Sequence, residues 1–232
     1  MPSKLSRCAC LFSLSSASCL LALGASEASA QLGQRPADQY IQAMDNPNRV
    51  ERIRVADVVE AIRLEPGDIV ADIGSGSGVF SIPMAQAIGP TGTLYAVDID
   101  QGMIDYVLER AGGEGLANVR GVLGEYGDPK LPARDVDVAF LHDTLHMIEL
   151  RQAYINALAT YLEPDGRIVV IEREADQVQN WMWLRQSDVD TWMAALSFYP
   201  VERPDFLGNQ WFTIYQRPYG DSELLRGNPG VP

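Results

Sequence analysis

The chain has 232 residues, of which 47% are hydrophobic, and this is enough for one domain with a substantial core. Its formal net charge of −13 argues against a broad basic surface for nucleic acid or for an anionic membrane. We therefore expect no nucleic-acid partner.

The first 30 residues differ from the rest of the chain. Lys4 and Arg7 give a positive start, residues 8–24 are apolar and small, and small residues lead up to Ala30. This order is typical of a secretory signal peptide, and the apolar part is short for a membrane span. We expect cleavage after Ala30, export to the periplasm or the medium, and no stable membrane insertion of the cleaved chain. Lipoprotein processing and an organelle transit peptide are the alternatives.

Cysteine occurs only in this first segment, at Cys8, Cys10 and Cys19. The cleaved chain would therefore have no disulfide, no thiolate metal site and no cysteine nucleophile. Beyond the segment we expect an extended N-terminal arm at residues 31–48 with a short helical piece at 38–44. One folded domain is expected at residues 49–218, followed by a flexible tail at residues 219–232.

An amphipathic helix is expected from Val50 to Ile62, because its apolar residues recur at a helical spacing. A Pro66-Gly67 turn then leads into a short apolar strand at residues 69–73. Such an apolar run is typical of a buried strand.

The glycine-rich stretch after this strand is the centre of the prediction. Gly74, Gly76 and Gly78 lack the side chain that would keep a ligand away from the backbone, and a helix follows to about Ile88. Strand, glycine loop and helix in this order form a nucleotide-sized binding turn. The spacing is not that of dinucleotide enzymes, because Val79 stands where their pattern has its last glycine. A plain strand-to-helix turn is the structural alternative.

The next apolar strand, at residues 93–98, ends in Asp98. A carboxylate at that point can accept hydrogen bonds from the ribose hydroxyls of a nucleoside. Its alternative role is to cap the following helix at residues 101–110, but Asp100 is better placed for that. We therefore expect Asp98 to bind ribose.

Strands and helices continue to alternate up to residue 172. The expected elements are strands at 118–125 and 135–141, a helix at 152–162, a turn at 163–166, a strand at 167–172, a helix near 187–196, and closing strands at 198–206 and 210–216. This order predicts an α/β fold with a parallel sheet and helices on both faces.

Four segments of the sequence form one pattern: the motif Asp72-x-Gly74-x-Gly76-x-Gly78, Asp98, the pair Asp143-x-x-His146, and the turn at residues 162–166. Together they resemble the class I S-adenosylmethionine-dependent methyltransferases. The likeness is to the ubiquinone, menaquinone and arsenite methyltransferases, and the layout resembles exported bacterial methyltransferase-domain proteins. It implies a Rossmann-like, doubly wound sheet of seven strands in the order 3-2-1-4-5-7-6, with only strand 7 antiparallel. It also implies S-adenosylmethionine as the cofactor, whereas arsenite chemistry is disfavoured because it needs cysteines.

The resemblance also implies which residues bind the cofactor: Asp72, Gly74, Ser75, Gly76, Gly78, Asp98, Ile99, Gly124, Glu125 and Leu141. Residues 72–78 would surround the methionine part, and Ile99 would pack on the adenine. Leu141 and His142 would border the sulfonium. Glu125 and its neighbour would lie at the adenine edge, where the family often has Asp instead.

His142 and His146 are the chain's two histidines, and Asp143 lies between them, so these three are the candidate catalytic residues. If this turn is helical, the two rings share a face, and His146 can act as a general base near neutral pH. A packed and hydrogen-bonded His146 is the structural alternative. A two-histidine metal site would need Asp143 or Glu149 as well, and because the spacing does not favour it we predict no metal.

The acceptor is expected to be a small or lipid-like molecule. Glu172 or Glu174 can face it, although a solvated strand end is the favoured interpretation of both. Aromatic residues of the last third either line an apolar pocket or, as is more common, belong to the core. They are Trp181, Trp183, Phe198, Tyr199, Trp211 and Phe212.

Two other functions compete with methyl transfer. Export would take the chain away from the compartment that makes S-adenosylmethionine, which is the argument for a non-catalytic binding module on the same fold. A nucleotide-dependent oxidoreductase is the other, and Val79 disfavours it.

Overall fold

The computed structural model describes residues 37–174 and 184–218. The predictions for the signal peptide, for the tail, and for Trp181 and Trp183 lie outside these residues. Within the described part, no helix has the length and apolar character needed to cross a membrane.

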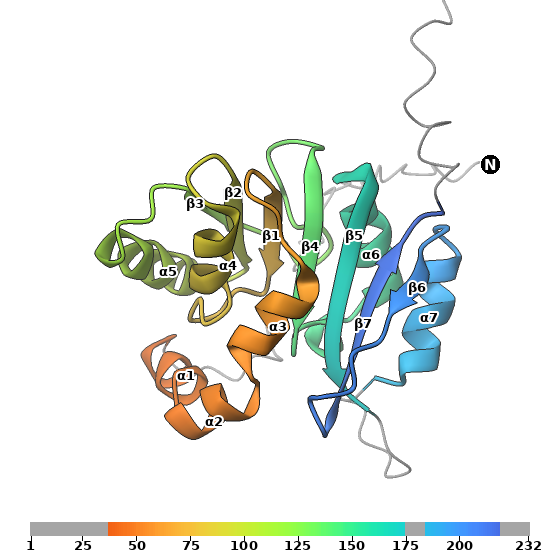
Figure 1. Cartoon of the computed structure of the whole chain (residues 1–232), viewed down its shortest axis with the longest axis horizontal. Helices are drawn as coiled ribbons and strands as arrows, with labels where there is room; N and C mark the ends of the chain where they lie inside the picture. The colour runs from red at the N-terminus through yellow and green to blue at the C-terminus, as the bar shows by residue number, and fades with distance from the viewer. Residues whose placement is uncertain (1–36, 175–183, 219–232) are drawn as a thin grey trace, which may run out of the picture. The chain divides into compact units, whose positions relative to one another are not determined.

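One sheet contains β1 (Ile69–Ile73), β2 (Thr93–Asp98), β3 (Val119–Leu123), β4 (Val136–His142), β5 (Leu162–Arg173), β6 (Tyr199–Glu202) and β7 (Gln210–Gln216) (Figure 1). The strand order is β3-β2-β1-β4-β5-β7-β6. Neighbouring strands are parallel except at β7, which runs antiparallel to both β5 and β6. The predicted α/β fold, its strand order and its antiparallel strand are therefore confirmed.

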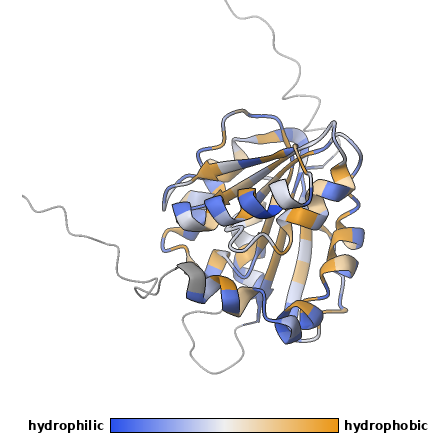
Figure 2. Cartoon of the chain, turned by 90° about the vertical axis from the view of Figure 1, so that its left-hand side faces the viewer, coloured by the Kyte–Doolittle hydropathy of each residue, from blue (hydrophilic) through white to orange (hydrophobic). Residues whose placement is uncertain are grey.

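Helices cover both faces of the sheet, because alternate residues of each strand point to opposite sides (Figure 1). On one face lie α3 (Val55–Ile62), α4 (Ser81–Ile88) and α5 (Gln101–Gly113), and on the other lie α6 (Arg151–Ala159) and α7 (Gln186–Ala194). Each face has its own buried cluster: Phe140 of β4 belongs to the first and Leu141 to the second. Figure 2 shows hydrophobic residues along the strands between the helices.

The helices that precede α3 are α1 (Ala37–Met44) and α2 (Pro47–Arg52). The short helical piece expected in the arm is α1. The single helix expected from Val50 to Ile62 is wrong, because the helical backbone is interrupted at Ile53 and Arg54. Ile53 is buried in the core, and Arg54 adopts a left-handed φ of 49°. A cap at Asn46 and the following Pro47 start α2 earlier, a signal that the continuous apolar spacing concealed.

The turn expected at residues 163–166 is also wrong, because these residues belong to β5. The strand is irregular at these residues. The register of its pairing with β4 shifts between Val136 and Val138. The other expected elements are present, with ends displaced by a few residues.

The topology fixes where a ligand can bind. The chain forms β1, β2 and β3 in one direction and then returns to place β4 beside β1. In open α/β sheets, ligands bind outside the carboxyl ends of the strands at such a reversal. The start of β7 reaches the same edge, because Gln210 pairs with Arg173 at the end of β5.

Candidate active site

The carboxyl edge of the sheet has two parts. We call the glycine loop after β1 and the end of β2 the cofactor half. We call the ends of β4 and β5 together with the start of β7 the acceptor half. The names follow the roles expected from the sequence.

The glycine loop packs closely against other parts of the protein. Gly74, Gly76 and Gly78 have φ values of 71°, 52° and 75°, which residues with a side chain rarely adopt. A Cβ atom on Gly76 would lie 2.7 Å from Sδ of Met44, and one on Gly78 would lie 2.9 Å from a methyl carbon of Val107. The loop backbone therefore lies against α5 and the end of α1 with no room for a side chain at these glycines.

Asp98 lies beside this loop, as predicted. Its Oδ2 accepts the backbone N–H of Gly76 at 3.0 Å, and its Oδ1 accepts that of Asp100 at 3.0 Å. Asp100 itself caps α5, because its Oδ1 accepts the N–H of Gly102 at 2.7 Å. Burial raises the pKa of Asp98 while these backbone hydrogen bonds lower it. Both carboxylate oxygens retain a lone pair that can accept a ribose hydroxyl.

Asp72 lies behind the loop, at the end of β1. It is buried, and its Oδ2 accepts the hydroxyl of Ser81 in the first turn of α4. Burial raises its pKa to about 7, opposed by the Ser81 hydrogen bond and reinforced by the charge of Asp98. Asp72 therefore links the end of β1, just before the glycine loop, to the first turn of α4 by a hydrogen bond.

Two buried hydroxyl groups of the loop have no hydrogen-bond partner among the described residues: those of Ser75 and Ser77. Buried polar groups are normally paired, so an unpaired hydroxyl in such a loop points to a bound water or ligand. The bare glycine backbone, the hydroxyl of Ser75 and the carboxylate of Asp98 together fit a nucleoside cofactor.

The remaining cofactor candidates differ in how well they are placed. Ile99 is exposed next to Asp98, and Gly124 donates its N–H to the carbonyl of Asp98 at 2.9 Å. The side chain of Glu125 instead forms an ion pair with Lys130 at 3.3 Å. Leu141 is fully buried in the core, so only its backbone can border a ligand.

In the acceptor half, His142 is a buried residue of β4. Its ring packs 4.7 Å from that of Phe80 and is stacked with Phe140. Burial lowers its pKa to about 4, although the charge of Asp143 raises it. The turn from His142 to His146 is not helical throughout, because β4 runs through His142 and Asp143 then adopts a φ of 50°. The two histidines therefore do not share a helix face.

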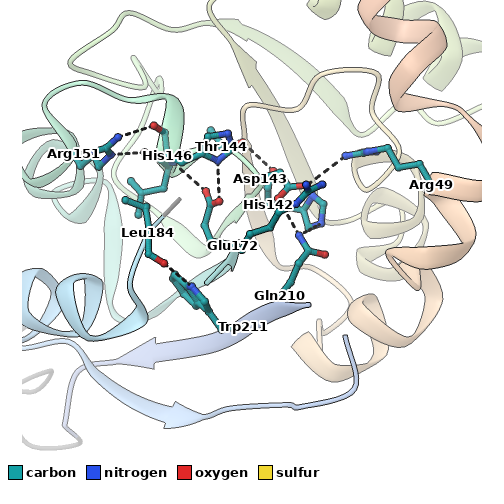
Figure 3. A network of polar contacts seen from close by, with 12 residues as sticks. Arg49, His142, Asp143, Thr144, His146, Arg151, Glu172, Leu184, Gln210 and Trp211 are labelled. Atoms are coloured by element: carbon teal, nitrogen blue, oxygen red, sulfur yellow. Dashed lines mark hydrogen bonds and ion pairs between the residues drawn. The ribbon is translucent and has the colours of Figure 1, made fainter. Parts of the chain in front are cut away.

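Asp143 is the centre of a polar cluster (Figure 3). Its Oδ1 accepts the side-chain amide of Gln210 at 2.9 Å. Guanidinium nitrogens of Arg49 and Arg173 lie 4.0 and 3.9 Å from its carboxylate oxygens. Three segments distant in the sequence, α2, β5 and β7, thus meet at this loop. Arg49 and Gln210 were missed by sequence reasoning, because no local motif marks them.

His146 lies on the 3₁₀ helix η1 (Leu145–Met147) and contacts Glu172 (Figure 3). Its Nδ1 is 2.9 Å from Oε2 of Glu172, and its backbone N–H donates to Oε1 at 3.2 Å. Glu172 is 1% exposed, so the favoured interpretation as a solvated strand end is wrong. Strand alternation contributes to this, because Glu172 shares a face of β5 with the buried residues Ile168 and Val170.

The aromatic residues that the structure describes belong mostly to the core. Phe198 and Phe212 are buried, and Trp211 donates its indole N–H to the carbonyl of Leu184 at 3.1 Å. Tyr199 is 48% exposed on the edge strand β6. These four residues do not form an apolar acceptor pocket. Among residues 37–174 and 184–218, no cluster of side chains suited to a metal ion was found.

The chain is similar to known methyltransferases over part of its length. The methyltransferase domain family model matches residues 64–211. Nocamycin O-methyltransferase of Saccharothrix syringae is 33% identical over 115 residues, which is 50% of this chain and 40% of that protein. A ubiquinone/menaquinone biosynthesis C-methyltransferase of Ectopseudomonas mendocina is 28% identical over 115 residues, which is 49% of this chain and 45% of that protein. The chain thus spans about half the length, or less, of these curated relatives.

A solved structure shows the same fold over a longer stretch. The S-adenosylmethionine-dependent methyltransferase of Aquifex aeolicus superposes with a TM-score of 0.71 at 20% identity, covering 80% of this chain and 100% of that one. The expected likeness to the ubiquinone/menaquinone and arsenite methyltransferases is confirmed. Because the family model covers more than half of the sequence, the chain belongs to the methyltransferase domain family, with S-adenosylmethionine as its matching cofactor.

Proposed function

We propose that this chain transfers the methyl group of S-adenosylmethionine to a small acceptor. The observation that carries the proposal is the carboxylate of Asp98, which the N–H of Gly76 holds beside the glycine loop. When bound, the cofactor supplies a methyl group on a positively charged sulfur, which is already activated for displacement. The protein's part is then to align the acceptor with the methyl group and to exclude water.

The cofactor half provides the binding groups. Asp98 would accept the ribose hydroxyls with the lone pairs left free by its backbone contacts. Ile99 would cover the adenine with its exposed side chain. The hydroxyl of Ser75 and the loop backbone would contact the methionine part, since the hydroxyl has no hydrogen-bond partner among the described residues and Gly76 has no side chain.

The segment that joins α1 to α2 would exclude water from this half. Met44 lies against the loop at Gly76, and Asp45 accepts the hydroxyl of Tyr106 at 2.9 Å. Arg110 adds an ion pair to Asp45 at 3.5 Å. Tyr106 and Arg110 are both on α5, the helix against which the glycine loop packs. Their contacts with Asp45 therefore hold the segment between α1 and α2 against that helix.

The polar lining of the acceptor half favours a small polar acceptor. Asp143, Gln210 and two arginines meet there, whereas the described aromatic residues are committed to the core. The net charge of −13 disfavours a nucleic-acid substrate, which would need a basic surface.

Isothermal titration of the full chain with S-adenosylmethionine tests the proposal. We expect binding in the micromolar range, and a loss of roughly 100-fold in Asp98→Ala because hydrogen bonds to a charged acceptor disappear. Asp105→Ala is the matched control. Asp105 is an acid on α5 whose carboxylate accepts a hydrogen bond from the side chain of Gln101 on the same helix. No heat with the wild-type chain, an equal loss in the control, or tighter binding of NADH would contradict the proposal.

We also propose that the chain is exported, on the strength of the positive start, the apolar stretch and the small residues before Ala30. Cell fractionation followed by mass spectrometry of the amino terminus tests this. A chain that begins at Gln31 in the exported fraction supports it. A full-length chain confined to the cytosolic fraction contradicts it.

A further inference from the structure

The contact between His146 and Glu172 is held from two elements. Both oxygens of Glu172 are used on one residue, Oε2 against the ring Nδ1 at 2.9 Å and Oε1 against the backbone N–H at 3.2 Å. From the other side, Arg151 at the start of α6 donates to the carbonyls of Leu145 and His146, at 3.2 and 2.7 Å. The position and the ring orientation of His146 are therefore both fixed.

This geometry selects one form of the neutral imidazole. A carboxylate only accepts hydrogen bonds, so the Nδ1 that faces Glu172 carries the ring proton. The lone pair is then on Nε2. Among the hydrogen bonds of the described residues, none engages Nε2, and the His146 side chain is 15% exposed. The ring thus presents a basic nitrogen from a position that the protein has fixed.

We propose that His146 is the general base that takes a proton from a hydroxyl group of the acceptor, and that Glu172 is the residue that positions it. The inference rests on the proposed methyl transfer. The acceptor oxygen forms a bond to the methyl carbon, the carbon–sulfur bond breaks with its electron pair going to sulfur, and the hydroxyl proton passes to Nε2 of His146. The positive charge lost at sulfur reappears on the imidazolium, which Glu172 stabilises.

A general base at this position favours a hydroxyl over acceptors that carry no proton at the attacked atom. A thioether or a tertiary amine carries no proton at the attacked atom and needs no base. For such an acceptor, the buried carboxylate that orients His146 would have no catalytic role. A hydroxyl becomes negative as its proton leaves. Arg173 directly follows Glu172, and both Arg173 and Arg49 lie about 4 Å from the carboxylate of Asp143, so two guanidinium groups lie beside the segment that leads to His146.

Nitrogen NMR of the imidazole rings tests the positioning independently of activity. The chain has two histidines, so the spectrum contains two rings, and His142→Gln assigns them. At a pH where both rings are neutral, we expect Nε2 of His146 to be unprotonated. In Glu172→Gln the carboxamide can donate to Nδ1, and we expect the proton to move to Nε2. Glu174→Gln, an exposed neighbour, should leave the ring unchanged.

A protonated Nε2 of His146 in the wild-type chain overturns the proposal, and the His142→Gln variant is used only to assign the two rings. The activity test uses S-adenosylmethionine labelled in its methyl group and the small-molecule fraction of a bacterial extract as acceptor. The label should appear on oxygen, and His146→Gln should lower its rate of transfer by roughly 100-fold with cofactor binding retained. Label on a thioether sulfur or a tertiary nitrogen would overturn the proposal. Failure to bind S-adenosylmethionine would instead remove the proposed function and leave the NMR result standing.

Discussion

The two halves of the site are built from contacts of different range. In the cofactor half, Asp98 bonds to Gly76 and Asp100, both within one strand-loop-helix unit and its successor. In the acceptor half, Asp143 meets Gln210, which lies 67 positions away. The first half is therefore built from contacts within a local motif, whereas the second depends on how distant strands are ordered in the sheet.

Each half also contains a buried titratable side chain, and the two respond to pH in opposite directions. Asp72 has its pKa raised to about 7, and His142 has its pKa lowered to about 4, in both cases chiefly because of burial. Both groups therefore favour the uncharged form in the folded chain. Variants of these residues separate the two halves by their effect on stability.

The largest effect is expected at Asp72. Below pH 4 this carboxyl is protonated in both the folded and the unfolded chain. As the pH rises to 7 the unfolded chain loses that proton first, so stability falls by on the order of 4 kcal/mol. Asp72→Asn should remove this fall in urea unfolding measured from pH 4 to 8. Asp105→Asn, on the surface of α5, is the control, and an unchanged slope in Asp72→Asn would show that Asp72 stays ionised in the folded chain.

A smaller and opposite effect is expected at His142. Between pH 6.5 and about 4 the unfolded chain takes up a proton that the folded chain excludes. Stability due to this residue is therefore lost as the pH falls through that window, by about 3 kcal/mol. His142→Gln should flatten the acid side of the same unfolding curves. If His146→Gln flattened it equally, burial of His142 would not be the cause.

The smallest effect separates the glycine loop from ordinary glycines. Gly76→Ala places a side chain at a φ of 52° and against Met44, which should cost about 1–2 kcal/mol of unfolding free energy. It should also weaken S-adenosylmethionine binding. Gly112→Ala in α5 has open space around its new Cβ and should stabilise by up to about 1 kcal/mol. Urea unfolding and calorimetric titration of both variants check this contrast, which fails if they behave alike.

The same difference in range explains what the sequence could predict. The glycine loop, Asp98 and the cap at Asp100 all follow from signals within about thirty residues of one another, since turn and cap chemistry is local. The strand order followed from the resemblance to a known family and not from any local signal. The break between α2 and α3 was not predicted, because Ile53 continues the apolar spacing across it.

The acceptor half could be predicted only in part. His146 was a candidate from its type and its neighbours, but its partner Glu172 was expected in solvent, because the pairing depends on β5 lying beside β4. Arg49 and Gln210 come from α2 and from β7, and only the folded topology brings them to Asp143. Burial of a charged side chain is a property of the assembled sheet and leaves no mark in the local sequence.

A crystal structure of the chain with S-adenosylhomocysteine tests directly whether the cofactor half is a nucleoside site. We expect the ribose hydroxyls within hydrogen-bond distance of the Asp98 carboxylate and the homocysteine part along the glycine loop. A ribose bound away from Asp98, or a ligand bound elsewhere with Met44 still against the glycine loop, would show that the cofactor half is not the nucleoside site.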